Sequence, residues 1–146
     1  MIVLDTNVVS ELMRSRPEPK VVRWVDGQRP GSLAVTAITA AELLFGVARM
    51  PGGRRRVAIG DAVVGMLRED FAGRILPFDA TSAERYAILV ADRERAGQRI
   101  GMADAQIAAI CAARDAPLAT RNGKDFVGTG IAVLDPWHPA DAGSAG

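Results

Sequence analysis

The chain has 146 residues, of which 18 are Lys or Arg and 17 are Asp or Glu, giving a formal net charge of +1. Hydrophobic residues (49%) and charged residues (24%) occur at ordinary globular frequencies, which excludes a disordered or fibrous chain. This length predicts one domain, and the near-neutral charge means that any polyanion must be held by a local basic patch. No apolar run approaches the roughly 20 residues that span a bilayer, and the N-terminus has no signal-peptide pattern, so we expect a cytoplasmic protein without a membrane segment.

The predicted elements begin with a strand that stops at an acid. Residues 1–4 are apolar, Asp5 follows them, and Asn7 is the predicted cap of a helix that ends before Pro17. A second helix begins at Pro19 and runs to about Gln28. A carboxylate at the end of a buried strand is costly unless a cation or several hydrogen-bond donors meet it, so a metal ion is our first hypothesis for Asp5.

Strands and helices alternate along the rest of the chain. Strands are predicted over residues 32–36, 74–78, 117–120 and 131–134, and helices from Thr39, over 54–70, from Thr81 to about 96, and over 102–115. This order predicts an α/β fold, a three-layer α/β/α sandwich around a five-stranded, mainly parallel sheet. We expect a domain over residues 1–137 and a flexible tail over residues 138–146, where Pro, Ala, Gly and Ser dominate.

Two apolar surfaces are candidates for partner binding. One is a stripe on the 54–70 helix, formed by Val57, Val64 and Leu67 and continued by Phe71, and the other is the helix that follows the first strand. Either could be ordinary core, or its exposed part could bind a peptide or a second copy of the chain.

The residue types exclude several kinds of catalytic site. The single Cys111 lies in an apolar helical segment, so we expect it in the core. The single His138 lies in a Pro-rich segment, which leaves no material for a Ser-His-Asp triad or a His-rich zinc site. Hydrolytic chemistry would therefore depend on carboxylates, which prefer magnesium or manganese.

Polar side chains follow several predicted strands. Asp5 ends strand one, Glu42 follows strand two, Asn122 follows strand four, and Asp104 lies in the first turn of a late helix. Because ligand sites in parallel sheets lie beyond the carboxyl ends of the strands, these side chains are expected to converge. Such a cluster would be strongly repulsive without a divalent cation.

Each of these residues also has a structural interpretation. Asp5 could accept N–H bonds from the next turn, and Glu42 could complete a capping box with Thr39, which is slightly favoured for Glu42 alone. Asp104 could complement its helix dipole, and Asn122 could cap a turn.

Two further acids are weighed in the same way. Asp125 has two equally good explanations, as a residue of a local turn and as a carboxylate beside the acid cluster. Asp79 also follows a strand, but that strand should lie outermost, so we expect Asp79 to be a turn acid.

Four motifs, in this order and spacing, resemble the PIN domain, and more narrowly the VapC-type toxins of the branch that includes FitB. They are Val3-Leu4-Asp5-Thr6-Asn7, Thr39-Ala40-Ala41-Glu42-Leu43, the helix that begins Ala103-Asp104, and Ala119-Thr120-Arg121-Asn122 with Asp125-Phe126. The resemblance implies an endoribonuclease that uses Mg²⁺ or Mn²⁺, is neutralised by a cognate VapB-like antitoxin, and cuts RNA, with structured tRNA or rRNA as the expected substrates.

The resemblance also implies roles for individual residues. Asp5, Glu42 and Asp104 stand at the positions of the family's acidic triad and are the expected metal ligands and catalytic residues. Asn122 stands at the fourth acidic position, where its neutral oxygen replaces a carboxylate, and Asp125 is a possible substitute.

Other residues are expected to bind substrate. Thr6 and Thr120 offer hydroxyls to waters or phosphate, and Arg121 and Lys124 flank Asn122. Further phosphate-binding candidates are Arg14, Arg16, Arg54, Arg55 and Arg56.

We expect a homodimer or higher oligomer. The alternatives are a catalytically silent PIN-like binding module, a metal-dependent DNA nuclease and a phosphatase.

Overall fold

The structure, a computed structural model, describes residues 1–139 and contains one parallel five-stranded sheet. Its strands are β1 (Ile2–Leu4), β2 (Leu33–Thr36), β3 (Ile75–Leu76), β4 (Leu118–Ala119) and β5 (Val133–Leu134). The order across the sheet is β3-β2-β1-β4-β5, so the chain builds outward from β1 on one side and then crosses over to build on the other. The predicted parallel sheet is confirmed, and β3 lies at its edge as expected.

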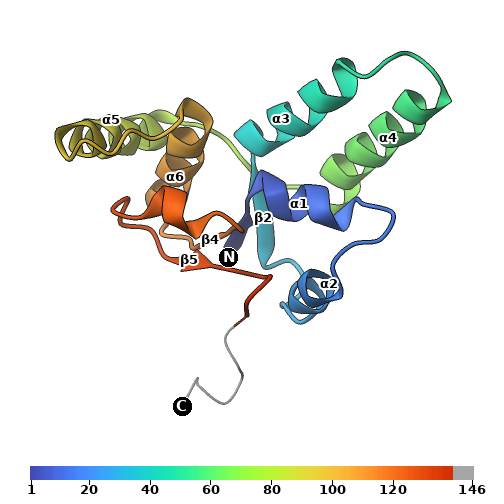
Figure 1. Ribbon diagram of the computed structural model, residues 1–146, viewed down its shortest axis with the longest axis horizontal. Coiled ribbons are helices and arrows are strands. Elements are labelled where there is room, and N and C mark those ends of the chain that lie inside the picture. Colours follow the sequence, from blue (N-terminus) through green and yellow to red (C-terminus); the bar gives the residue numbers. More distant parts are fainter. Residues whose placement is uncertain (140–146) are drawn as a thin grey trace.

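Six α-helices connect the strands (Figure 1). They are α1 (Thr6–Leu12), α2 (Pro19–Asp26), α3 (Ala37–Ala48), α4 (Arg54–Gly65), α5 (Ala80–Arg95) and α6 (Met102–Arg114). Two short helices complete the fold, a π-helical turn η1 (Met66–Asp70) that continues α4, and a 3-10 turn η2 (Gly123–Phe126) between β4 and β5.

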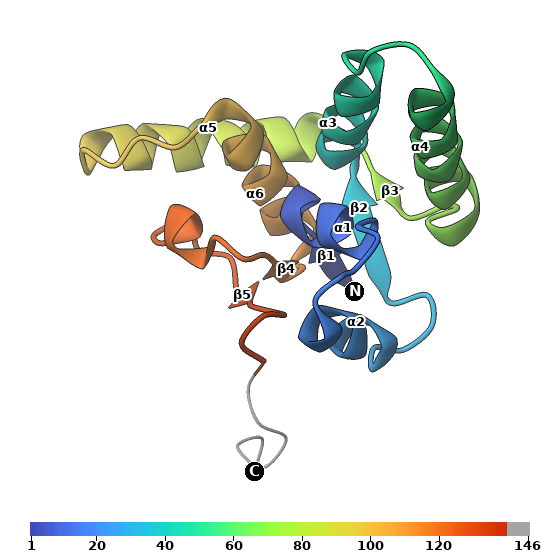
Figure 2. The ribbon, with the colours of Figure 1, turned by 45° about the vertical axis from the view of Figure 1, so that its right-hand side comes forward.

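The sheet separates two apolar cores because neighbouring residues of a strand face opposite sides. On one side, Val3 packs with residues of α5 and α6, including Leu89 and Ile107. On the other side, Leu4 packs with residues of α1, α2 and α4. Figure 2 shows α5 and α6 on one side of the strands and α1 and α2 on the other. The predicted three-layer sandwich is confirmed, and Cys111 is fully buried in the first core, as expected.

Three helices begin one to three residues earlier than the sequence suggests. Thr36, the last residue of β2, has extended backbone (φ −95°, ψ 160°), and its hydroxyl accepts the Thr39 N–H at 3.1 Å. Asp79 caps α5 in the same way, and Asp5 caps α1. Each cap is thus the residue at which the chain leaves the extended conformation, immediately before the helix. The caps predicted at Asn7, Thr39 and Thr81 were therefore wrong.

The apolar stripe predicted on the 54–70 helix is buried at its C-terminal end and exposed at its N-terminal end. Leu67 and Phe71 are buried against the sheet, whereas Val57 is 61% exposed. Figure 1 shows why: α3 and α4 form a pair that projects beyond the sheet, and α4 begins at its far end. Only the C-terminal part of the stripe is core.

The predicted end of the domain and the predicted flexible tail meet near the C-terminal end of the described residues. Trp137 is 8% exposed and packs in the second core. Residues 140–146, most of the predicted flexible tail, lie outside the described residues, so the division at residue 137 stays a prediction. Within residues 1–139, no helix has both the length and the apolar composition needed to cross a membrane.

Candidate active site

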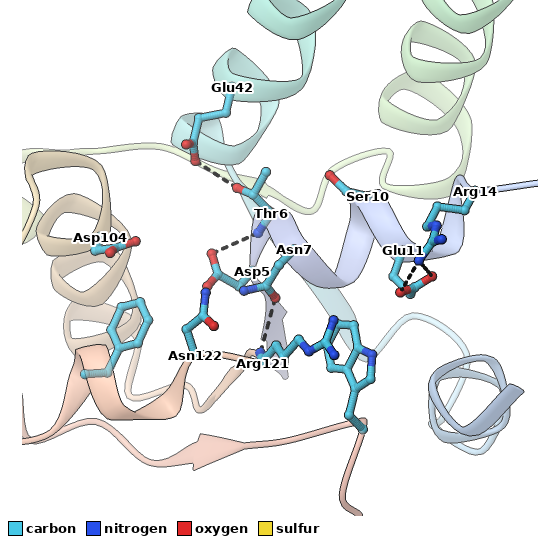
Figure 3. Close-up of a pocket in the computed structure, with 12 residues that line it drawn as sticks. Asp5, Thr6, Asn7, Ser10, Glu11, Arg14, Glu42, Asp104, Arg121 and Asn122 are labelled. Atoms are coloured by element: carbon cyan, nitrogen blue, oxygen red, sulfur yellow. Dashed lines mark hydrogen bonds and ion pairs between the residues drawn. The ribbon is translucent and has the colours of Figure 1, made fainter. Parts of the chain in front are cut away.

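A pocket of about 520 Å³ lies at the carboxyl ends of β1, β2 and β4. This is where the strand order reverses, the usual position of a ligand site in an open parallel sheet. Strand ends, the first turns of helices and the loop after β4 all contribute to its walls. The lining residues are Asp5, Thr6, Asn7, Ser10, Glu11, Arg14, Glu42, Asp104, Arg121, Asn122, Phe126 and Trp137 (Figure 3).

Asp5 is the most buried carboxylate of the pocket, with 5% of its surface exposed. Its Oδ1 accepts the Thr6 N–H at 2.8 Å, and its Oδ2 accepts the Thr120 hydroxyl at 2.7 Å. Burial raises the pKa of Asp5, and the charges of Glu42 and Asp125 raise it further, while the two hydrogen bonds act in the opposite direction. The structural interpretation of Asp5 is therefore correct in part, but the hydrogen bonds do not outweigh the cost of burial.

Glu42 extends from α3 toward the first turn of α1 (Figure 3). Its Oε1 accepts the Thr6 hydroxyl at 2.8 Å, and the same hydroxyl lies 3.0 Å from the Thr39 hydroxyl. Because Thr36 is the cap of α3, Glu42 is not the acid of a capping box. That alternative was wrong, and the Glu42 carboxylate is instead held at the pocket by Thr6.

Asp104 lies in the first turn of α6 and enters the pocket from the side opposite α1 (Figure 3). Burial raises the pKa of Asp104, and the charges of Asp5, Asp125 and Glu42 add to this effect. A favourable helix dipole alone would lower the pKa of this carboxyl, so repulsion and desolvation dominate here. Three carboxylates from three separate elements thus share one pocket.

The loop after β4 completes this end of the pocket. Asn122 is exposed, and its side chain makes no capping hydrogen bond, while its backbone N–H donates to the Thr120 hydroxyl at 3.1 Å. Asp125 does not line the pocket, but its charge acts on both Asp5 and Asp104. Asn7 ties the loop to α1, because its Oδ1 accepts the Arg121 N–H at 3.2 Å.

The PIN domain family matches residues 2–130 of this chain. The chain belongs to the PIN-domain family. It is 44% identical over 140 residues to the VapC ribonuclease Y4jK of Sinorhizobium fredii, covering 96% of this chain and 100% of that protein. It is 38% identical to the toxin FitB of Neisseria gonorrhoeae, covering 94% and 99%. The predicted resemblance to VapC and FitB is therefore confirmed.

Solved structures of this group share the whole fold. FitAB bound to an IR36 DNA fragment superposes with a TM-score of 0.91 at 37% identity, covering 97% of this chain and 99% of that one. FitAcB from Neisseria gonorrhoeae gives a TM-score of 0.89 at 38% identity, covering 94% and 99%. The PIN fold that the four sequence motifs implied is thus the fold of these toxin–antitoxin structures.

The pocket acids Asp5, Glu42 and Asp104 suit a cation that keeps several waters rather than one bound only by protein side chains. Within residues 1–139, no three Asp, Glu, His or Cys side chains stand together closely enough to form a complete metal site. The ion pairs found in the same part of the chain leave Asp5, Glu42 and Asp104 without a Lys or Arg partner. Mg²⁺ usually keeps several waters and binds one or two carboxylates together with substrate phosphate. Hard oxygen donors without a Lys or Arg partner in the described residues fit such an ion.

The residues expected to bind substrate fall into two groups in this PIN domain. Arg121 lines the pocket, and Lys124 is exposed on η2 outside its lining. Thr6 and Thr120 instead hold the pocket acids, since the Thr6 hydroxyl donates to Glu42 and the Thr120 hydroxyl donates to Asp5. Thr120 is fully buried.

Sequence reasoning missed part of the pocket wall. Ser10, Glu11, Phe126 and Trp137 were not predicted, although Arg14 was. The signal was present in the sequence, because residues 7, 10 and 11 of α1, and residue 14 just beyond it, follow the three- and four-residue spacing of one helical face.

Proposed function

We propose that this PIN-domain protein is the endoribonuclease toxin of a toxin–antitoxin pair and that it hydrolyses RNA phosphodiester bonds with a bound Mg²⁺ or Mn²⁺. The observation that carries the proposal is the meeting of Asp5, Glu42 and Asp104 in one pocket at the carboxyl edge of the sheet. The names of its relatives, a VapC ribonuclease and the toxin FitB, support the same activity.

The pocket residues divide the chemistry between them. A divalent ion held by one or two of the carboxylates of Asp5, Glu42 and Asp104, with waters as its other ligands, would lower the pKa of a bound water and neutralise charge on the phosphate. Thr120 and the Thr6 N–H keep the Asp5 carboxylate in place. Asp104 or Glu42 would accept the proton of the attacking water. The products are a 5′-phosphate and a 3′-hydroxyl.

The substrate we propose is RNA in which the cut strand is exposed, such as a loop of tRNA or rRNA. The deep groove of an A-form helix hides base edges, whereas a loop presents its backbone and unstacked bases. We place the reaction in the cytoplasm, where such RNA is available.

The proposed partners are a cognate antitoxin and a second copy of this chain. A groove of about 670 Å³ between α1, α3 and α4, with Met13, Leu43 and Val47 in its wall, suits an apolar peptide or helix of the antitoxin. Phe45 and Leu44 of α3 are 64% and 41% exposed, and we propose that they contact the second copy. Light scattering at micromolar concentration should give the mass of a dimer, and a monomer would contradict this part of the proposal.

The activity is tested with the purified chain, freed of antitoxin. RNA should be cleaved with Mg²⁺ or Mn²⁺ and not with EDTA, and Asp5→Asn should abolish cleavage. Asp61→Asn, which removes an exposed acid of α4 outside the pocket, is the matched control and should remain active. Activity that survives both chelation and Asp5→Asn would overturn the mechanism.

The same assay separates the alternative functions. Single-stranded DNA and a phosphomonoester are offered beside RNA under identical conditions. Preference for either over RNA would favour a DNA nuclease or a phosphatase. A wild-type chain that is folded but inactive on all three, with Asp5→Asn changing only stability, would favour a silent binding module.

A further inference from the structure

The pocket has a second end, away from Glu42 and Asp104, where Arg121 meets Trp137 (Figure 3 shows Arg121 pointing away from Asp104). We propose that this end is a nucleotide-binding subsite, in which the Arg121 guanidinium binds the phosphate next to the scissile one and stacks on its base. The inference rests on the proposed ribonuclease function and adds to it the residues that hold the neighbouring nucleotide.

Arg121 is fixed at both of its ends. Its guanidinium carbon lies 5.0 Å from the centroid of the Trp137 ring, a cation–π contact. Its backbone N–H donates to Asn7 Oδ1 at 3.2 Å. An exposed Arg normally loses much side-chain freedom when it binds a ligand, and a side chain already held on a ring loses less. Arg121 is therefore preorganised for a ligand in the pocket.

The Trp137 ring is the surface on which the Arg121 guanidinium stacks. Trp137 is only 8% exposed, packs in the second core, and its backbone N–H donates to Asp135 at 2.9 Å. A nucleobase has little access to such a buried ring. Arg121 itself is exposed, and Arg planes stack on unpaired RNA bases. The expected order is therefore indole, guanidinium and base.

The charge of Arg121 is available to a phosphate. In the described part of the chain Arg121 has no carboxylate partner, whereas the nearby Arg14 is paired with Glu11 at 3.2 Å. Glu11 is 6% exposed and also lies 3.4 Å from the Glu18 backbone N–H, so its own charge is compensated. Of the two Arg side chains that line the pocket, only Arg121, which stacks on Trp137, lacks a carboxylate partner within residues 1–139.

The position of Arg121 indicates a nucleotide rather than a separate small anion. Arg121 directly precedes Asn122, and one continuous pocket joins Trp137 to Asp5. Its volume of about 520 Å³ is in the range of sites that enclose a small-molecule ligand. A strand whose scissile phosphate lies at the acids would thus bring its next nucleotide to Arg121.

Binding in EDTA measures this subsite without cleavage. The anisotropy of a labelled single-stranded RNA gives the Kd for wild type, Arg121→Met and Arg121→Lys over a range of salt concentrations. Arg121→Met should raise Kd about tenfold and reduce the slope of log K against log salt by about 0.7, the value for one phosphate contact on a single strand. Arg121→Lys should keep the salt slope and still bind about fivefold more weakly, because an ammonium does not stack.

Arg23 provides the matched control, since it is an exposed Arg of α2 that does not line the pocket. Arg23→Met should bind RNA as the wild type does. In cleavage assays with Mg²⁺, the Arg121 variants should raise KM more than they lower kcat, because they remove binding to a group remote from the reacting phosphate.

Trp137 offers a direct reporter of the subsite. The chain has two Trp residues, so Trp24→Phe leaves Trp137 alone. A short single-stranded RNA should change the emission of Trp137 in this variant, and adding Arg121→Met should remove the change.

The outcomes separate this inference from the proposed function. RNA cleavage by the wild type together with unchanged Kd, salt slope and KM in both Arg121 variants would overturn the subsite alone. A wild type that neither binds nor cuts RNA would overturn both. An Arg121→Met effect that equals that of Arg23→Met would also overturn the subsite, since it would reflect general charge.

Discussion

The hydroxyl of Thr120 donates a 2.7 Å hydrogen bond to Oδ2 of Asp5 across two neighbouring parallel strands. The sheet register causes this contact, because Leu4 pairs with Ala119 and the next residue of each strand follows in step. The same hydroxyl accepts the side-chain amide of Asn7 and the backbone N–H of Asn122, each at 3.1 Å. One buried hydroxyl therefore positions a carboxylate, the first turn of α1 and the loop after β4.

Thr120→Val removes this hydroxyl and keeps the shape of the side chain. It should lower the free energy of unfolding by about 1–3 kcal/mol, because buried donors are left without an acceptor. Loss of the contact should also lower RNA cleavage by about 10–100-fold, as for other residues that orient a metal ligand. Urea denaturation and a cleavage assay measure the two effects. Thr120→Ser retains the hydroxyl and should stay near wild type, so equal behaviour of Val and Ser would contradict this role.

Divalent ions should stabilise the folded chain through the acid pocket. With Mg²⁺ or Mn²⁺ at 100 times Kd, the expected gain is about 2.7 kcal/mol, because a ligand that binds only the folded state shifts the unfolding equilibrium. Asp5→Asn should remove most of this gain, while Asp61→Asn should retain it. Thermal unfolding at fixed ionic strength, with Na⁺ replacing the dication, measures the shift. An equal gain in Asp5→Asn would place the ion elsewhere.

The fold was largely predictable because its signals are local and repeated. Apolar runs that end in polar residues define the strands, and their alternation with helical patterns requires a parallel sheet. The outermost position of β3 followed from the same order. Asp79, which was expected to be a turn acid, is instead the N-cap of α5. The meeting of Asp5 with Glu42 followed from the strand ends.

Other features depend on three-dimensional contacts that a linear pattern does not contain. A Thr-x-x-Glu spacing cannot say which Thr leaves the extended conformation, so Thr39 was chosen although Thr36 is the cap. Trp137 is the last residue of the predicted domain, next to a segment whose composition indicates a loose end, and its ring is buried beneath Arg121. The contact is made by residues 16 positions apart, on either side of the strand predicted over residues 131–134, and only the folded chain brings them together.

Asp79 should make stability depend on pH in the acid range. Hydrogen bonds from the Ser82 N–H and hydroxyl, both 2.9 Å, lower the pKa of Asp79 below its ordinary 3.8. Because the folded state holds the ionised form, the stabilisation is present above the unfolded pKa and is lost as the pH falls through the lowered folded pKa. Asp79→Ala should therefore be less stable than wild type at pH 7, and the difference should shrink toward pH 2.

Asp79→Ser is the control for this effect, since Ser is a good cap but has no charge to titrate. The gap in thermal midpoint between Asp79→Ser and Asp79→Ala should be independent of pH. If the difference in thermal midpoint between wild type and Asp79→Ala is also constant from pH 7 to pH 2, the ionised form of Asp79 does not stabilise the cap.

Cys111 should be chemically silent in the folded chain. It is fully buried on α6, and burial raises the pKa of its thiol to about 12, with a further contribution from the charge of Asp5. Only the thiolate reacts readily, so a disulfide reagent at pH 8 should label no thiol in the native protein and one in urea. Labelling of the native chain as fast as a free thiol would contradict the burial of this side chain.

Arg93 on α5 holds the loop that carries Asn122 and Asp125. It is 8% exposed, and its guanidinium donates to the backbone carbonyls of Val127 and Asp125, the latter at 3.3 Å. Its Nε is buried and has no hydrogen-bond partner in the described residues. The ring of Phe126 in the first core also anchors this loop, and the Asn122 N–H donates to the Thr120 hydroxyl at its start. A residue more than 30 positions away thus fixes the segment beside the acid pocket.

Substitution of Arg93 should loosen this loop more than the rest of the fold. Arg93→Lys keeps the charge but replaces a forked donor by a single ammonium, so at least one carbonyl loses its partner, and stability should fall by about 1–3 kcal/mol. Hydrogen exchange should accelerate at residues 123–130, with smaller changes in β1 and β2. Leu89→Ala, which weakens the same helix one turn earlier and removes no hydrogen bond to the loop, is the matched control. Exchange in residues 123–130 that rises equally in both variants would show that Arg93 supports only the fold, because the loop would then respond to general destabilisation.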